Sequence, residues 1–185
     1  MKYIFDFDDV IFETTRRRLE HVYPFLEERG IPVSEIDDYY KKVRGEQFSI
    51  KKLLKHFSLG EELYEEMMHG SETFANPELI ELIKKMGKEN CYLITYGDED
   101  FQRDKIKILN VGSLFLEIIV VPTDEKRKLI EEICARYPDE TVLFIDDKAK
   151  HFVNLDFKKY PKLRTVHWDK QHGLEKLKEE IAKNT

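Results

Sequence analysis

The chain has 185 residues, a formal net charge of -6 and a hydrophobic fraction of 41%. This length fits one domain, or one domain with a small insertion, and the hydrophobic fraction is enough to form a core, which excludes a disordered chain. No basic block stands out, so electrostatics give no support for a nucleic-acid partner. The sequence contains no secretory signal and no run of about 20 apolar residues. We therefore expect a cytoplasmic protein that binds neither nucleic acid nor a membrane.

Five short apolar runs predict β-strands along the chain. They span residues 3–7, 91–95, 117–121, 142–146 and 163–168. Several of these runs are apolar throughout rather than alternating, which is typical of parallel strands that are covered on both faces. Helical patterns lie between them: Asn76-Pro77 begins one helix, a second follows Thr123-Asp124, and the last lies near the C-terminus. This alternation predicts an α/β fold with a doubly wound parallel sheet.

Residues 14–75 interrupt the alternation of strands and helices. They contain no convincing strand, but their apolar residues recur at helical spacing in several stretches. These stretches run from Leu19 to Leu26, Ile36 to Val43, Ile50 to Phe57 and Glu61 to Met68. We therefore expect a small helical subdomain of residues 14–75, inserted into an α/β core of residues 1–13 and 76–185.

Polar groups follow four of the predicted strands at the point where each strand ends. They are Asp6-Phe7-Asp8-Asp9-Val10, Thr95-Tyr96-Gly97, Lys126 and Asp146-Asp147. Ligands of open α/β sheets bind in the crevice beyond the carboxyl ends of the strands. Carboxylates gathered at the end of a buried strand repel one another and are costly to desolvate, so a fold retains them when a cation binds there. The pattern therefore predicts a metal site.

The order of these four groups resembles the haloacid dehalogenase superfamily of phosphatases and phosphotransferases. Its first motif, Asp-x-Asp-x-Thr/Val after an apolar strand, is similar to the segment from Asp6 to Val10. The strand that ends in Thr95, the lysine at Lys126 and the acid pair Asp146-Asp147 are similar to its second, third and fourth motifs. The resemblance covers residues 1–13 and about 77–170. It implies a Rossmann-like core with a small helical cap, which residues 14–75 would form.

The resemblance also implies a role for each of these residues. Asp6 would attack phosphorus and form an aspartyl-phosphate, while Asp8 would act as general acid and then as general base. Mg²⁺ would be held by Asp6, the backbone carbonyl of Asp8 and the pair Asp146-Asp147. Which member of the pair would bind the ion directly, and which through water, is left open. Thr95, backbone N–H groups near Tyr96 and Gly97, and Lys126 would bind the phosphate.

Some neighbouring residues compete for these roles or have an ordinary structural explanation. Lys128 competes with Lys126, although the first turn after the third strand favours Lys126. We expect His151 to be an exposed helix residue, and Arg16-Arg17-Arg18 and the segment 41–45 to be solvated helix surface rather than substrate contacts. Tyr39-Tyr40 is expected to belong to the core of the cap.

The expected function is that of a Mg²⁺-dependent phosphatase for a small phosphorylated substrate. A dehalogenase would use the same nucleophile on carbon, but a halide leaving group needs no proton, and Asp8 therefore argues against that function. A phosphomutase would use the same residues. A non-catalytic binding protein with this fold would usually have lost the nucleophile or an acid of the fourth motif, and neither is lost here. The sequence leaves the substrate and the oligomeric state undetermined.

Overall fold

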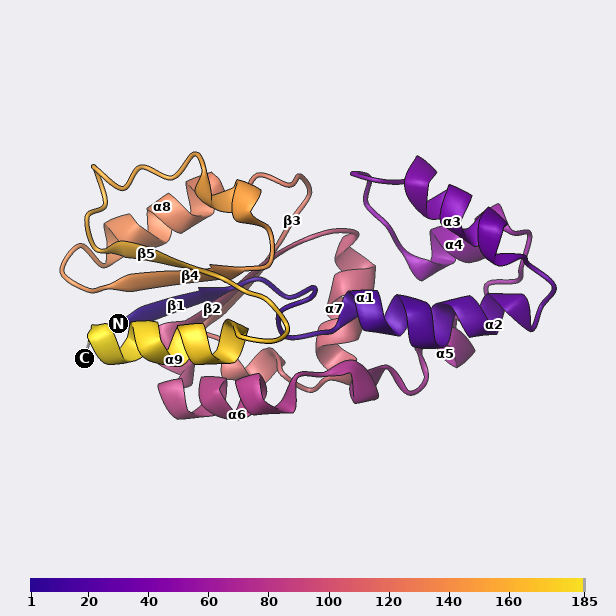
Figure 1. Cartoon of the computed structure of the whole chain (residues 1–185), viewed down its shortest axis with the longest axis horizontal. Coiled ribbons are helices and arrows are strands. Elements are labelled where there is room, and N and C mark those ends of the chain that lie inside the picture. Colours follow the sequence, from indigo (N-terminus) through magenta and orange to yellow (C-terminus); the bar gives the residue numbers. More distant parts are fainter. Residues whose placement is uncertain (185) are drawn as a thin grey trace.

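The computed structural model describes residues 1–184 and contains a five-stranded parallel sheet with the strand order β3-β2-β1-β4-β5 (Figure 1). The strands are β1 (Lys2–Phe5), β2 (Cys91–Tyr96), β3 (Glu117–Val121), β4 (Val142–Asp146) and β5 (Leu163–His167). Phe5 of β1 lies level with Leu93 of β2 and Ile145 of β4, so the carboxyl ends of these strands meet at one edge. The predicted doubly wound α/β fold is confirmed.

Helices cover both faces of the sheet, as the continuous apolar strands require. They are α6 (Pro77–Met86), α7 (Glu99–Ile108), α8 (Arg127–Arg136) and α9 (Gly173–Lys183). On one face Phe5 and its strand neighbours pack with residues of α6, α7 and α9. On the other face Ile4 and Phe144 pack against Ile130 and Ile133 of α8. Successive residues of a strand point to opposite faces, so the β1 sequence Tyr-Ile-Phe supplies both cores.

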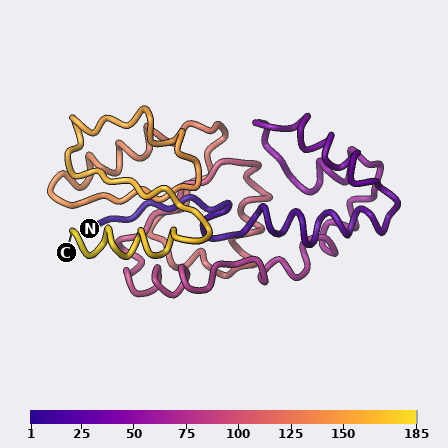
Figure 2. Tube along the Cα trace, viewed as in Figure 1, coloured from indigo at the N-terminus to yellow at the C-terminus, as the bar shows by residue number. Residues whose placement is uncertain are grey.

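The segment between β1 and α6 is helical, as predicted. Its helices are α1 (Thr14–Arg17), a π-helical stretch (Arg18–Val22), α2 (Tyr23–Glu27), α3 (Val33–Lys42), α4 (Ile50–His56) and α5 (Leu63–Met68). They enclose a hydrophobic cluster of their own that includes Leu26, Ile36 and Leu53, and Phe101 of α7 packs into the same cluster. The tube in Figure 2 shows these helices extending away from the sheet, beyond α7. We refer to them as the cap.

Two backbone segments connect the cap to the sheet, and they pair with each other. The Glu13 N–H donates to the Phe74 carbonyl at 2.8 Å, and the Asn76 N–H donates to the Ile11 carbonyl at 2.9 Å. The exact division at residues 13/14 and 75/76 stays a prediction. Within residues 1–184, none of the helices has both the length and the apolar character needed to cross a membrane.

The first strand is shorter than predicted. It ends at Phe5, and the apolar residue Phe7 belongs to the turn that follows, because its carbonyl accepts hydrogen bonds from three successive backbone N–H groups, those of residues 10–12. Asp9 adopts a left-handed backbone with φ 57° in this turn. Tight chain reversal directly after β1 brings the polar residues Asp6, Asp8 and Asp9 to the edge of the sheet.

Candidate active site

Three carboxylates converge where β1 and β4 end. Asp6, Asp146 and Asp147 each offer an oxygen atom, and these oxygens lie within 4.8 Å of one another. Asp6 and Asp146 are almost fully buried, with exposed fractions of 2% and 0%. Phe5 lies level with Ile145 in the sheet, so the residues that follow them lie side by side. This register brings the acids together.

The electrostatics of this cluster favour a bound cation. Burial raises the pKa of Asp6, and the charge of Asp146 raises it further against the opposing effect of Lys126. Burial and the charge of Asp6 raise the pKa of Asp147 to about 7. One Asp147 carboxylate oxygen is buried without a hydrogen-bond partner among the described residues. Hard oxygen donors with an unsatisfied negative charge fit Mg²⁺, so these residues are suited to hold it.

Lys126 lies between two of the acids. Its ammonium is 2.8 Å from an Asp6 oxygen and 2.7 Å from an Asp146 oxygen, and the side chain is buried. Burial alone would lower the pKa of Lys126, but the two carboxylates raise it above the ordinary value. Lys128 instead has an exposed side chain beside Glu132. Of the two candidate lysines, only Lys126 contacts the acid cluster.

At the end of β2, Thr95 supplies a buried hydroxyl, and Gly97 follows at a position where there is no room for a side chain. Thr95 is 0% exposed, and its hydroxyl has no hydrogen-bond partner within residues 1–184. The Gly97 N–H donates to the Val121 carbonyl over a long 3.4 Å. A side chain at Gly97 would collide with the Gln102 amide, because a Cβ there would lie 2.6 Å from its Nε2. Tyr96 and Gly97 both line the cavity described below.

Asp8 is not one of the three acids of the cluster, and it is held by three side chains that the sequence analysis did not include. The Gln102 amide donates to it at 2.7 Å, and both the Thr14 hydroxyl and the Lys105 ammonium also donate to it. Burial alone would raise the pKa of Asp8, but Lys105 and these hydrogen bonds hold it below the ordinary value. Lys105 is itself buried, with an exposed fraction of 1%. One signal could have identified it: Lys105 stands four residues after Phe101, on the buried face of α7.

The expectation of an exposed His151 was wrong. Its side chain is only 5% exposed, with one ring nitrogen 2.8 Å from Asp146 and the other 2.8 Å from Asp124. The reason is local: after β4 the chain forms a single 3₁₀ turn, Ala149–Phe152, rather than a surface helix. His151 and Lys126 lower the pKa of Asp146 against the effect of its burial. His151 therefore holds a predicted metal ligand in place.

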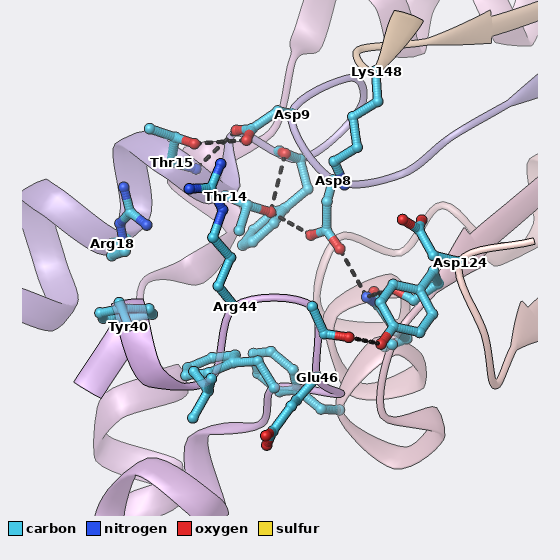
Figure 3. Close-up of a pocket in the computed structure, with 18 of the residues that line it drawn as sticks. Asp8, Asp9, Thr14, Thr15, Arg18, Tyr40, Arg44, Glu46, Asp124 and Lys148 are labelled. Carbon is cyan, nitrogen blue, oxygen red and sulfur yellow. Dashed lines mark hydrogen bonds between the residues drawn. The ribbon is translucent and has the colours of Figure 1, made fainter. Parts of the chain in front are cut away.

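A cavity of about 760 Å³ extends from Asp8 and Gly97 to the cap helices (Figure 3). The cap contributes Arg18, Tyr40 and Arg44 to its wall. The prediction of a fully solvated arginine run was wrong for Arg17, which is 4% exposed and donates to the Met67 carbonyl and the Ser71 hydroxyl. Tyr39 lies in the cap core as expected, whereas its neighbour Tyr40 reaches the cavity.

Solved structures of haloacid dehalogenase-like hydrolases share this fold. One from Burkholderia xenovorans matches with a TM-score of 0.70 and 16% identity over 99% of this chain and 88% of its own. The HAD-hydrolase YfnB from Bacillus subtilis, bound to magnesium, matches with a TM-score of 0.52 and 18% identity over 89% of this chain and 84% of its own. A dehalogenase in an intermediate complex matches with a TM-score of 0.56 and 10% identity over 92% of this chain and 85% of its own. No family model and no curated protein matches the sequence. At these identities the likeness concerns the fold alone.

Proposed function

The chain has the fold of the haloacid dehalogenase-like hydrolases, as its motifs predicted, and from this premise we propose that it is a Mg²⁺-dependent phosphomonoester hydrolase. One observation carries the proposal: Asp6, Asp146 and Asp147 converge within 4.8 Å, and the Lys126 ammonium touches two of them. A site of this kind combines a carboxylate nucleophile with cations that offset the repulsion between that nucleophile and a phosphate dianion.

Asp6, Asp146, Asp147 and the backbone carbonyl of Asp8 are the groups that would hold Mg²⁺. The ion, when bound, would supply positive charge between the nucleophile and the phosphate. Without it, two negative unit charges about 4 Å apart repel each other by about 4 kcal/mol at an effective dielectric constant of 20. The magnesium bound to YfnB, which has the same fold, supports this choice of ion. The buried and unpartnered Asp147 oxygen supports it independently.

Phosphate binding would fall to Thr95, the backbone at Tyr96-Gly97 and Lys126. The Thr95 hydroxyl has no protein partner among the described residues, so it is free to donate to a phosphate oxygen. Lys126 would neutralise charge on both the nucleophile and the transferring group. The Gly97 N–H would exchange its long bond to Val121 for a phosphate oxygen.

Asp8 would protonate the leaving oxygen and then take a proton from water. Its carboxylate lies on the cavity side of the turn and carries no proton while Lys105 contacts it. Use of Asp8 as an acid therefore requires that this contact loosens when substrate enters. Interdomain movement, which is described for YfnB, would provide a means if this cap moves in a similar way.

Two activities of the same superfamily are alternatives. A dehalogenase shares the fold, as the intermediate complex illustrates, but the second acid Asp8 has no task when the leaving group is a halide. A phosphomutase would use the same residues and would return the phosphate to its substrate. Release of inorganic phosphate separates hydrolysis from that second alternative.

The test is hydrolysis of p-nitrophenyl phosphate with Mg²⁺, with EDTA and in single variants. We expect Asp6→Asn to lower kcat by at least about 10³-fold, because the nucleophile is lost. Lys126→Gln is expected to lower it strongly, while Lys128→Gln, its exposed counterpart, leaves it unchanged. Activity that survives both Asp6→Asn and EDTA would reject the proposal.

A further inference from the structure

Six basic side chains line the cavity between the cap and the sheet. They are Arg17, Arg18, Arg44, Lys105, Lys148 and Lys150. Three of them are already engaged: Lys105 contacts Asp8, Lys150 contacts Asp124, and Arg17 is buried inside the cap. The remaining three are available to an anion that enters the cavity.

These three cations are divided between the two ends of the cavity. Lys148 follows the acid pair, and the charges of Asp6 and Asp147 act on it, so it belongs to the phosphate end. Arg18 and Arg44 come from the cap, and Figure 3 draws Arg18 on the side opposite Lys148. Within residues 1–184, neither arginine forms an ion pair with a carboxylate.

Arg18 is held in position although it has no acidic partner. Its guanidinium lies 5.0 Å from the centre of the Tyr40 ring. That ring is fixed in turn by stacking on Tyr23, at 5.9 Å, and on Phe48, at 5.3 Å. The Arg18 Nε–H is buried and has no hydrogen-bond partner among the described residues. A buried donor without an acceptor is costly, so an acceptor on a ligand is the natural partner.

None of the acids that line the same cavity forms an ion pair with either arginine in the described part of the chain. Asp8 and Asp124 are occupied by the lysines named above, and both Asp9 oxygens accept hydrogen bonds from Thr15. Glu46 is the remaining acid of the wall, and Figure 3 shows its carboxylate pointing away from Arg44. Within residues 1–184, Arg18 and Arg44 are therefore cap cations of the cavity wall that no carboxylate pairs with.

We propose that Arg18 and Arg44 bind a second anionic group of the substrate, so that the substrate is a phosphomonoester with a carboxylate or a further phosphate at its other end. This inference rests on the proposed function, because it takes the acid cluster and Lys126 as the site of the ester phosphate. The cavity of about 760 Å³ is within the usual range for a small-molecule site and much larger than one phosphate requires. Guanidinium groups suit both carboxylate and phosphate, because they donate in a planar fork.

Binding to the inactive Asp6→Asn protein with Mg²⁺ tests the inference without turnover. Calorimetric titrations compare 3-phosphoglycerate with glycerol 3-phosphate, which differ by a carboxylate in place of an alcohol, and fructose 1,6-bisphosphate with fructose 6-phosphate. The doubly anionic member of at least one pair should bind about tenfold more tightly or better, as expected for one charge-assisted hydrogen bond. The pair with the larger ratio identifies the second group as carboxylate or phosphate.

Three further substitutions in that background locate the effect. Arg18→Gln and Arg44→Gln should each reduce the affinity ratio towards one, whereas Arg18→Lys should retain part of it. Lys42→Gln removes the same charge from an exposed position on α3 that is outside the cavity wall, and it should leave the ratio intact. If Arg18→Gln does not fold, the exposed residue Arg44 carries the test alone.

The outcomes separate this inference from the proposed function. A ratio near one in both pairs, no measurable binding of either doubly anionic ligand, or a ratio that survives both arginine substitutions would overturn the inference, even if wild-type protein hydrolyses p-nitrophenyl phosphate. A ratio of ten or more that both arginines control would support a second anion site at Arg18 and Arg44, even if wild-type protein releases no phosphate from p-nitrophenyl phosphate.

Discussion

Lys105 and Asp8 form an ion pair although 97 positions separate them in the sequence. The pair joins α7 to the turn after β1, and the lysine side chain is buried. Because burial of Lys105 lowers its own pKa while Asp8 opposes this effect, each group depends on the other to stay charged. The predicted general acid is thus held in its ionised form.

Lys105→Met should move the pH profile of an alkyl phosphatase reaction. Without the ammonium, burial dominates and the pKa of Asp8 rises. An acid that must be protonated loses activity as pH passes above its pKa, so the alkaline limb of kcat/KM should shift to higher pH. Lys107→Met, on an exposed position of the same helix, is the control. If the alkaline limb of kcat/KM lies at the same pH in Lys105→Met and in the wild type, Lys105 does not set the pKa of the general acid.

Asp147→Asn should stabilise the metal-free protein at high pH. Asp147 titrates at a pKa of about 7 in the folded protein, against about 3.9 for an unfolded chain. Between these values the folded protein retains a proton that the unfolded chain releases, so the stability contributed by this group falls as pH rises from about 4 to about 7. At pH 8 the variant should gain on the order of 2 kcal/mol, after allowance for partial exposure, and nothing at pH 4.

Chemical unfolding at both pH values, with and without Mg²⁺, measures this difference. Saturating Mg²⁺ should stabilise the wild type more than Asp147→Asn, because only the wild type retains the full ligand set. Asp139→Asn changes an exposed acid and should behave like the wild type. A variant that is less stable than the wild type at pH 8 without metal would contradict the repulsion between Asp6 and Asp147.

His151→Gln should weaken Mg²⁺ binding by about 10- to 100-fold, the effect expected when a group that orients a metal ligand is lost. The imidazole bridges Asp146 and Asp124, so its removal takes away one of the three hydrogen bonds that hold the Asp146 carboxylate within residues 1–184, beside those from Lys126 and the Lys148 N–H. Calorimetric titration with Mg²⁺ measures the affinity directly. His69→Gln, at an exposed position in the cap, is the control. An unchanged dissociation constant would show that the Lys126 ammonium and the Lys148 backbone N–H are sufficient to orient Asp146.

Tyr96→Phe should loosen the contact between the cap and the sheet. The Tyr96 hydroxyl donates to the Gly45 carbonyl at 2.9 Å, and the nearby Gln47 amide donates to the Pro122 carbonyl at 2.8 Å. Each such bond contributes about 0.5–1.5 kcal/mol, so its loss should favour an open cap. Hydrogen exchange of residues 43–48 should accelerate in the variant, while exchange in β1 should not change. Equal exchange rates would mean that other contacts hold the cap.

The sequence was sufficient to predict the sheet and the meeting of three of the four polar groups, those of Asp6, Lys126 and Asp146-Asp147. Strands of a parallel sheet end at one edge, so groups that follow strands in the sequence must meet in space, and Asp6, Lys126 and Asp146 do. Periodicity was also sufficient for the inserted helices. Both inferences use local sequence patterns, and such a pattern nearly fixes where the strand end or the helix face lies in the folded protein.

The environment of Asp8 could not be predicted in the same way. Lys105 belongs to a residue type that is usually exposed, and it is buried here beside an acid 97 positions away. His151 lies between Asp146, which is close in the sequence, and Asp124, which is 27 positions away. Arg17 is a similar case, since its partners Met67 and Ser71 follow it by 50 and 54 positions. Pairing between distant polar residues leaves no periodic signal along the chain.

Mass spectrometry of the acid-quenched protein tests most directly whether Asp6 attacks phosphorus. After incubation with p-nitrophenyl phosphate and Mg²⁺, one phosphoryl group should be found on the peptide that contains Asp6, and it should be absent from Asp6→Asn and from samples with EDTA. Turnover without any phosphorylated peptide, or a phosphoryl group on another residue, would contradict the assignment of Asp6 as nucleophile.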